Sequence, residues 1–160
     1  PGCGLGHDVR AISGASPAAE VIGLDIAPSA VDRAAEFGRA GSEVFQHGDL
    51  FALGPDLVGQ FDWVWEHTCF CAIDPSMREA YVSAVASALK LGGQLAAIFY
   101  LNPYDDEHRL EDGGPPFGAS IEELESLFSP RFEIVSSWVP ARAYDGRENR
   151  ERMMILRLVS

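Results

Sequence analysis

Three glycines alternate at the start of the chain, in the sequence PGCGLGHDVRA. Gly2, Gly4 and Gly6 run directly into a stretch that reads as a helix. Glycine adopts positive φ values without steric cost, and its missing Cβ lets the backbone come close to a ligand. The spacing is GxGxG, because His7 stands where the dinucleotide fingerprint GxGxxG has its third glycine. The cluster therefore indicates either a cofactor loop or a plain tight turn.

Two carboxylates follow the glycines at positions that suit a nucleoside. Asp25, in the sequence GLD, lies 19 residues after Gly6 and ends an apolar segment. It could accept hydrogen bonds from two ribose hydroxyl groups, since an ionised carboxyl has two acceptor oxygens. Asp49, in HGDLF, follows the next apolar segment and could meet an adenine edge. The alternative for Asp25 is a solvated carboxylate at a strand end, whereas Asp8 is expected to interact with the helix dipole.

The elements that must position these residues alternate between strand and helix patterns. Such alternation is typical of βαβ units and predicts a three-layer α/β fold with a mostly parallel sheet. Ligands of these sheets bind outside the carboxyl ends of the strands. The expected strands are Glu20–Ile26, Ser42–Gln46, Phe61–His67 and Gln94–Leu101. The glycine loop should itself follow a central strand, so we expect residues upstream of Pro1 in the native protein.

Helix signals are clearest in the middle of the chain. One helix is expected over Pro28–Ala40, and another runs from Asp74 as N-cap and Pro75 as first helical residue to Gly92–Gly93. A short helix opens with a capping box formed by Ser120 and Glu123. The expected buried stripes are Val82, Val85, Ala86 and Leu89 in the second helix, and Leu124, Leu127 and Phe128 in the third.

The remaining segments are one long loop and a C-terminal pair. Asn102–Ala119 is irregular and longer than an ordinary connection, which favours a lid or a binding loop. Arg131–Val139 and Arg152–Val159 are apolar and are separated by a charged loop, so they predict an antiparallel pair of strands.

Composition limits the classes of function. The 160 residues are 47% hydrophobic, which suits one domain over residues 1–160. The net charge of −12 would repel a phosphate backbone, so we expect no nucleic acid as partner. No apolar run approaches the roughly 20 residues that span a bilayer, so we expect no membrane either.

Cysteine and acidic residues give no metal signal. Cys3, Cys69 and Cys71 are odd in number and have no CxxC spacing, and we expect reduced thiols in a cytoplasmic protein. One acidic run has the composition of a metal site, but adjacent acids in a loop are usually solvated, so no metal is expected. This run is Asp105, Asp106, Glu107 and His108.

The glycine loop with its two following carboxylates resembles the class I S-adenosylmethionine-dependent methyltransferases. Three later segments are similar to the thiopurine S-methyltransferase-like family, which includes thiol, thiocyanate and halide methyltransferases. These segments are FDWVWEHTCFCAIDPSMREAY, GGPPFGASIEELESLF and PARAYDGRE. The resemblance covers essentially the whole chain. It implies S-adenosylmethionine as cofactor. It also implies a seven-stranded, mostly parallel sheet with an antiparallel C-terminal strand. The first strand of that fold and its N-terminal helix are expected upstream of this sequence.

The resemblance also implies the residues of a site. The cofactor-binding residues would be Gly2, Cys3, Gly4, Gly6, Asp25, Ile26, Asp49, Leu50, Phe51, Glu66 and His67. The resemblance implies Arg78 and Arg147 as the catalytic cations that hold the acceptor. Independently of the resemblance, Thr68 and Phe70 follow the strand Phe61–His67 and should border the transferred methyl group, and Phe70, Phe117 and Trp138 are the candidates for a dry wall around the acceptor. For Phe70 and Cys71 simple core packing is an open alternative. For each arginine the alternative is a solvated surface position.

The implied reaction is methyl transfer to a small soft nucleophile, such as a thiol, thiocyanate, a halide or a thiopurine, by in-line displacement. Joining a sulfonium to an anion neutralises charge, so alignment in a dry site supplies the catalysis and no strong base is required. The open alternatives are N- or O-methylation of another small molecule and a non-catalytic S-adenosylmethionine-binding module. The tripeptide Asn102–Tyr104 resembles part of a motif of DNA amino-methyltransferases, but it lacks one proline and follows a different strand. We expect a monomer that acts on a small molecule.

Overall fold

The computed structural model describes residues 1–104 and 113–160. These residues form two compact units, Pro1–Leu53 and Gly54–Ser160, each with its own sheet. The acidic run from Asp105 to His108 lies outside the described residues. A single domain over residues 1–160 stays a prediction.

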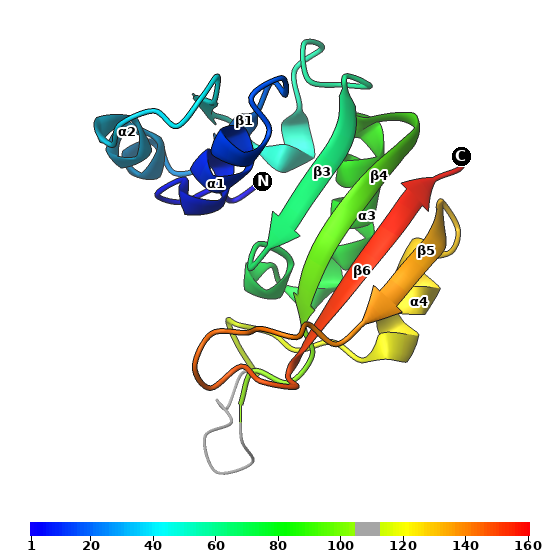
Figure 1. The fold of residues 1–160 in the computed structure, drawn as a ribbon. Coiled ribbons are helices and arrows are strands. Elements are labelled where there is room, and N and C mark those ends of the chain that lie inside the picture. The colour runs from blue at the N-terminus through cyan, green and yellow to red at the C-terminus, as the bar shows by residue number, and fades with distance from the viewer. Residues whose placement is uncertain (105–112) are drawn as a thin grey trace. The chain divides into compact units, whose positions relative to one another are not determined.

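The N-terminal unit contains a two-stranded parallel sheet and two α-helices (Figure 1). Along the chain, one helix precedes the first strand and the other follows it. Its elements are α1 (His7–Ala15), β1 (Ile22–Asp25), α2 (Pro28–Glu36), β2 (Val44–His47) and the 3₁₀ helix η1 (Leu50–Ala52). The strands pair in register from Ile22 opposite Val44 to Asp25 opposite His47. Both predicted strands are present. Their parallel pairing brings the residues that follow Asp25 and His47 to the same edge of this sheet.

Helix α2 begins at Pro28 as the sequence predicts, but it ends at Glu36, so the predicted end at Ala40 is wrong. Buried Glu43 explains the early stop. Its two carboxylate oxygens accept hydrogen bonds from the backbone N–H groups of Ala40 and Gly41, each at 2.7 Å. These donors are held in a turn before β2 and are no longer available to a helix.

The C-terminal unit is built on a four-stranded mixed sheet (Figure 1). Its elements are β3 (Phe61–His67), the 3₁₀ helices η2 (Phe70–Ala72) and η3 (Pro75–Met77), α3 (Arg78–Ala88), β4 (Leu89–Tyr100), α4 (Ile121–Phe128), β5 (Phe132–Trp138) and β6 (Glu151–Leu158). The strand order is β3-β4-β6-β5. Strands β3 and β4 are parallel, and β6 runs antiparallel to both β4 and β5. The predicted C-terminal antiparallel pair is confirmed, and so is the strand Phe61–His67.

The predicted end of the second helix at Gly92–Gly93 is wrong. The side chain of Asp74 caps η3 by accepting from the N–H of Ser76, α3 follows from Arg78, and β4 begins at Leu89. Gly93 therefore lies inside a strand. A Cβ there would lie 2.9 Å from the carbonyl oxygen of Lys90 and 3.0 Å from that of Phe61. The register of β3 and β4 shifts at this place, so glycine here allows two backbones to approach at an irregularity of the ladder.

An aromatic core joins the sheet of this unit to α3 and α4, which lie on the same face of it (Figure 1). Phe70 is at the centre, and its ring centroid lies 5.3 Å from that of Tyr81, 5.1 Å from that of Phe99 and 6.3 Å from that of Phe128. Aromatic pairs at such separations contribute about 0.5–1.5 kcal/mol each beyond area burial. The turn after β3 is thereby tied to the core.

Candidate active site

The glycine loop adopts the left-handed backbone that its sequence predicts. The φ angle is 59° at Gly2, 51° at Gly4 and 73° at Gly6, where α1 begins. At Gly6 an added Cβ would lie 2.2 Å from the ring of Phe45, so packing excludes a side chain there. At Gly4 an added Cβ would meet no atom within 4 Å. The loop therefore combines a glycine that packing requires with one that leaves open space beside the backbone.

Asp25 fastens this loop to the end of β1. Its Oδ2 accepts a hydrogen bond from the N–H of Gly4 at 2.8 Å, and its Oδ1 accepts from the N–H of Ala27 at 2.9 Å. The N–H of Cys3 donates to the carbonyl of Leu24 at 3.0 Å. Each carboxylate oxygen keeps a second lone pair, so Asp25 can accept two further hydrogen bonds. The structure thus joins two residues that the sequence analysis assigned to one cofactor site.

Asp49 follows β2 at the same edge of the N-terminal sheet as Asp25. Its Oδ1 accepts from the N–H of Phe51 at 2.8 Å and opens η1. Ile26 is 65% exposed and Phe51 is 38% exposed, while Leu50 is half-buried. Apolar side chains beside two carboxylates have the composition that binds the base and ribose of a nucleoside.

Glu66, near the end of β3, is fully buried and is engaged by three protein donors. Its Oε1 accepts from the N–H groups of Cys69 at 2.8 Å and Phe70 at 2.9 Å, and its Oε2 accepts from the hydroxyl of Tyr81. Burial raises the pKa of Glu66. Burial and the nearby Glu66 raise the pKa of Tyr81 well above its ordinary value. Glu66 therefore holds the turn after β3, and its contact with a cofactor stays a prediction.

Thr68 in this turn has a strained backbone. Its φ of 67° is a conformation that β-branched residues rarely adopt. Such strain costs about 1–3 kcal/mol and is concentrated at functional sites. The Thr68 hydroxyl donates to the carbonyl of His67 at 2.6 Å, and its carbonyl accepts from the Cys71 Sγ at 3.5 Å. Burial, followed by the negative charge of Glu66, raises the pKa of Cys71 to about 11, so this side chain is a neutral thiol at pH 7.

The C-terminal loop brings the predicted cation Arg147 to the end of β3. The ring of Tyr144 stacks on that of His67, with centroids 6.0 Å apart and planes 5° apart. The Arg147 guanidinium lies 5.7 Å from the Tyr144 centroid and 4.8 Å from that of Tyr100. It also pairs with buried Glu151 at 3.2 Å. Because 29% of the Arg147 side chain is exposed, its charge is accessible to a ligand.

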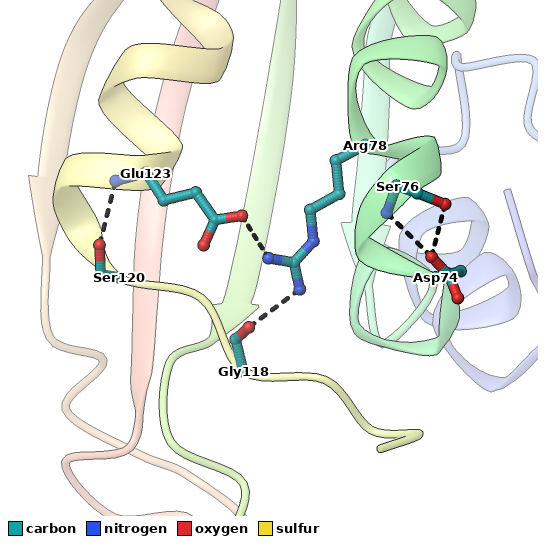
Figure 2. A network of polar contacts seen from close by, with 6 residues as sticks. All are labelled: Asp74, Ser76, Arg78, Gly118, Ser120 and Glu123. Carbon is teal, nitrogen blue, oxygen red and sulfur yellow. Dashed lines mark hydrogen bonds and ion pairs between the residues drawn. The ribbon is translucent and has the colours of Figure 1, made fainter. Parts of the chain in front are cut away.

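Arg78, predicted as the second cation, already has protein partners (Figure 2). Its Nη1 forms an ion pair with Glu123, and its Nη2 donates to the carbonyl of Gly118 at 2.9 Å. The guanidinium also lies 4.8 Å from the ring centroid of Phe70. Its side chain is 3% exposed, and its buried Nε has no hydrogen-bond partner among residues 1–104 and 113–160. The solvated-surface alternative for Arg78 is therefore wrong, and a substrate could reach this charge only after the chain moved.

The predicted acceptor wall is spread over the C-terminal unit. Phe70 is 2% exposed in the aromatic core, which favours the packing alternative. Phe117 is half-buried, and its N–H donates to the carbonyl of Cys71 at 2.6 Å. That bond brings Phe117 to the turn that follows β3.

Trp138 lies in the same row of the sheet as His67 but three strands away. The register pairs His67 with Ile98, Ile98 with Met153, and Met153 with Trp138. Adjacent strands are spaced about 4.8 Å apart, so the two backbones are separated by about 14 Å. One small acceptor does not span this distance.

The described part of the chain shows neither a metal-binding cluster nor a membrane-spanning helix. Residues 1–104 and 113–160 contain no group of three or more His, Cys, Asp or Glu side chains that could hold a metal ion. No helix in these ranges has both the length and the apolar composition needed to cross a bilayer.

The chain matches a known family model over most of its length. The family model described as thiopurine S-methyltransferase matches residues 1–153. The chain belongs to the thiopurine S-methyltransferase family. The resemblance inferred from the glycine loop and the three later segments is thereby confirmed.

Curated relatives of this family member include plant and bacterial enzymes. Thiocyanate methyltransferase 1 of Brassica oleracea is 39% identical over 141 residues, which are 85% of this chain and 58% of the relative. The probable thiol methyltransferase 2 of Arabidopsis thaliana is 36% identical over 85% of this chain and 58% of the relative. The thiopurine S-methyltransferase of Xanthobacter autotrophicus is 30% identical over 71% of this chain and 51% of the relative. The chain thus spans between half and three fifths of the length of these relatives.

Solved structures support the fold. A S-adenosylmethionine-dependent methyltransferase from Methanosarcina mazei matches 99% of this chain and 90% of its own, with a TM-score of 0.74 and 21% identity. A structure described under the conversion of a disulfide bond into a thioacetal group in echinomycin biosynthesis matches 99% of this chain and 73% of its own, with a TM-score of 0.75 and 20% identity. The α/β class predicted from the alternating pattern, and the methyltransferase-like fold implied by the family resemblance, are confirmed at this level.

Four residues of this thiopurine S-methyltransferase family member were missed by the sequence analysis. They are Tyr81, Tyr100, Glu123 and Tyr144. Tyr81 lies four residues before Val85 on the buried stripe of α3, a signal that marks it as a core residue. Glu123 was assigned to a capping box, and its backbone N–H does donate to the Ser120 hydroxyl at 3.1 Å. No local pattern indicates that its carboxylate pairs with an arginine 45 residues away.

Proposed function

We propose that this protein binds S-adenosylmethionine and transfers its methyl group to a small soft nucleophile. The observation that carries the proposal is the hydrogen bond from the N–H of Gly4 to the Asp25 carboxylate. It joins a left-handed glycine loop to the carboxyl end of a parallel strand, where α/β sheets bind their ligands. Membership of the thiopurine S-methyltransferase family and relatives named thiocyanate and thiol methyltransferases support the reaction and the acceptor class. The finer fold in this proposal is a seven-stranded, mostly parallel sheet.

The residues of the N-terminal unit fit the cofactor. The open space beside Gly4 admits a ligand against bare backbone, and Asp25 keeps two free acceptor sites for ribose hydroxyl groups. Asp49 would accept from the exocyclic amine of adenine, between the apolar side chains of Ile26 and Phe51. When bound, the cofactor supplies an electrophilic methyl group on a sulfonium.

The C-terminal unit supplies the acceptor-binding residues in this proposal. Arg147 carries an accessible positive charge between Tyr100 and Tyr144, and the strained turn at Thr68 lies at the end of the same strand as His67. Glu151 engages only Nη1 of the Arg147 guanidinium, so the anion would contact its other N–H donors. We do not assign Trp138 to this contact, since its strand is too distant from His67.

The titratable groups in and beside the turn at Thr68 favour an acceptor that is already anionic. Glu66 has a raised pKa and three donors occupying its carboxylate. Tyr81 and Cys71 have raised pKa values and stay protonated at neutral pH. None of these three side chains suits the removal of a proton from a neutral hydroxyl or amine. A thiolate, thiocyanate or halide needs only to be held in line with the methyl carbon.

An acceptor panel with labelled S-adenosylmethionine tests the proposal. The full-length protein is incubated with aromatic thiols, thiocyanate, iodide, catechols and amines, and labelled product is counted with and without a chelator. We expect transfer to thiols, thiocyanate or halides that a chelator leaves unchanged. Faster methylation of catechols or amines would favour the N- or O-methyltransferase alternative. Tight cofactor binding with no transfer to any acceptor would favour the non-catalytic module.

We further propose a monomer in a reducing, cytoplasmic compartment with no nucleic-acid partner. Cys3, Cys69 and Cys71 are all free thiols, which suits a reducing compartment. The net charge of −12 opposes binding to a phosphate backbone. Sedimentation of the full-length protein tests the monomer, and a gel-shift assay with DNA and RNA tests the absence of a nucleic-acid partner.

A further inference from the structure

A salt bridge and a hydrogen bond join three separate segments of the C-terminal unit (Figure 2). Arg78 is the first residue of α3, Glu123 lies in the first turn of α4, and Gly118 precedes α4. The Arg78 guanidinium pairs with the Glu123 carboxylate and donates to the Gly118 carbonyl at 2.9 Å. We call Arg78, Glu123 and the Gly118 carbonyl the brace.

Each side chain of the brace lies close to a helix cap, that of η3 for Arg78 and that of α4 for Glu123 (Figure 2). Before α3, the Asp74 carboxylate accepts from the N–H and the hydroxyl of Ser76, at 2.9 Å and 2.6 Å. Before α4, the hydroxyl of Ser120 accepts from the N–H of Glu123 at 3.1 Å. The Asp74 cap fixes η3, which ends directly before Arg78, and the Ser120 cap fixes the first turn of α4, so the two partners start from defined positions. The charge of Arg78 is thereby held against Glu123 rather than left to sample solvent.

The brace fixes the segment that carries Phe117. The N–H of Phe117 donates to the Cys71 carbonyl at 2.6 Å, while the carbonyl of the next residue, Gly118, accepts from Arg78. A Cβ at Gly118 would lie 2.5 Å from the carbonyl oxygen of Leu101, so this backbone is also pressed against the end of β4. Phe117 therefore lies between two anchored peptide groups, and these anchors fix the direction in which its half-buried side chain leaves the backbone.

We propose that Arg78 and Glu123 are positioning residues that fix the Phe117 ring as an acceptor-selecting wall, and that Arg78 does not itself contact the acceptor. The proposal rests on the function proposed above. Three observations separate it from a direct contact. The Arg78 side chain is 3% exposed, its charge is paired with Glu123, and its remaining face covers the ring of Phe70. Glu123 is 39% exposed, so the pair can be altered from its acidic side without opening the core.

The kinetic test compares single and double variants of the full-length protein. Arg78→Met should raise the KM for the acceptor by about tenfold, the scale of a lost hydrogen bond to a charged group. The dissociation constant of S-adenosylmethionine should stay within about twofold of the wild-type value. Glu123→Gln should act in the same direction with a smaller effect, and Arg78→Lys should restore part of the loss. Arg157→Met is the matched control, because Arg157 forms an exposed pair with Glu133 in the same unit.

The double variant with Phe117→Ala separates positioning from direct contact. If Arg78 acts through Phe117, adding Arg78→Met to Phe117→Ala raises the acceptor KM no further. If Arg78 binds the acceptor itself, the two effects multiply, and that result overturns the proposal. The comparison is made with thiocyanate and with an aromatic thiolate, and positioning predicts the larger effect for the bulkier acceptor.

Amide hydrogen exchange tests the brace without any need for activity. Arg78→Met and Glu123→Gln should speed exchange at Phe117 and its neighbours by about tenfold or more, while β5 and β6 keep wild-type rates. Unchanged exchange at Phe117 in a folded Glu123→Gln protein overturns the proposal even if Arg78→Met unfolds. If the wild-type protein methylates no acceptor, the proposed function fails, and the exchange result still decides whether the brace positions this segment.

Discussion

Replacing Asp25 by alanine should weaken binding of S-adenosylmethionine by at least about tenfold. The carboxylate accepts from Gly4 at 2.8 Å and from Ala27 at 2.9 Å, and both oxygens keep a lone pair for ribose. A hydrogen bond to a charged group contributes about 1.5–3 kcal/mol, so losing one ribose bond already corresponds to tenfold or more. Losing the bond to Gly4 also loosens the glycine loop, which adds to the effect.

Titration calorimetry on folded protein measures this change, and two further variants refine it. Asp25→Asn can accept from only one of the two backbone donors with its amide oxygen, so we expect an intermediate affinity. Asp32→Ala removes an exposed acid from α2 of the same unit and should leave the affinity unchanged. An Asp25→Ala protein with wild-type circular dichroism and wild-type affinity would refute the assignment of this carboxylate to the ribose.

Three other predictions follow from the titratable and charged groups. The pKa of Glu43 is lowered to about 2, chiefly by the N–H of Ala40, so its contribution to stability is present above the ordinary glutamate pKa and is lost as pH falls toward 2. Glu43→Gln should therefore lower the melting temperature at pH 7, with the difference from wild type shrinking in acid, as followed by thermal denaturation at several pH values. Arg147→Ala should raise the acceptor KM by about tenfold while the cofactor dissociation constant stays unchanged, because its exposed charge loses one ion contact; equal effects on both constants would argue against an acceptor role. Cys71, with a pKa raised to about 11, should resist alkylation by iodoacetamide at pH 8 in the folded protein and react after denaturation, as mass spectrometry of the labelled peptide would reveal.

The sequence was sufficient where a residue's role depends on its near neighbours. The positive φ values of Gly2, Gly4 and Gly6 follow from the absence of a Cβ, and the whole of β3 follows from its apolar pattern. The Ser120 cap was likewise predictable, because a cap involves residues three apart. These features depend on residues close together in the chain, so they can be predicted from the sequence alone.

The sequence misled where distant groups decide the outcome. Gly92–Gly93 is a helix-ending signal by composition, but the close approach of the Phe61 carbonyl to Gly93 belongs to strand pairing. The Glu43 carboxylate shortens α2 because it accepts hydrogen bonds from the N–H groups of Ala40 and Gly41. An acidic residue before a strand is no sequence signal for this role.

The candidate site divides in the same way. The partnership of Gly4 and Asp25 could be predicted because parallel strands bring their carboxyl ends to one edge. The pairing of Arg78 with Glu123 could not be predicted, since it depends on how α3 and α4 pack together, and both helices contact the ring of Phe70 through Tyr81 and Phe128. Sequence reasoning therefore assigned Arg78 to the acceptor, whereas its burial points to a structural contact.

The pH dependence of methyl transfer to a series of aromatic thiols tests the central claim most directly. The claim is that the acceptor arrives as an anion and that the protein aligns it without removing a proton. We predict that the rate at low acceptor concentration rises through each thiol's own pKa and shifts along the series as that pKa shifts. A rate governed by one fixed pKa for every thiol would show that a group of the protein removes the proton, and it would contradict this account.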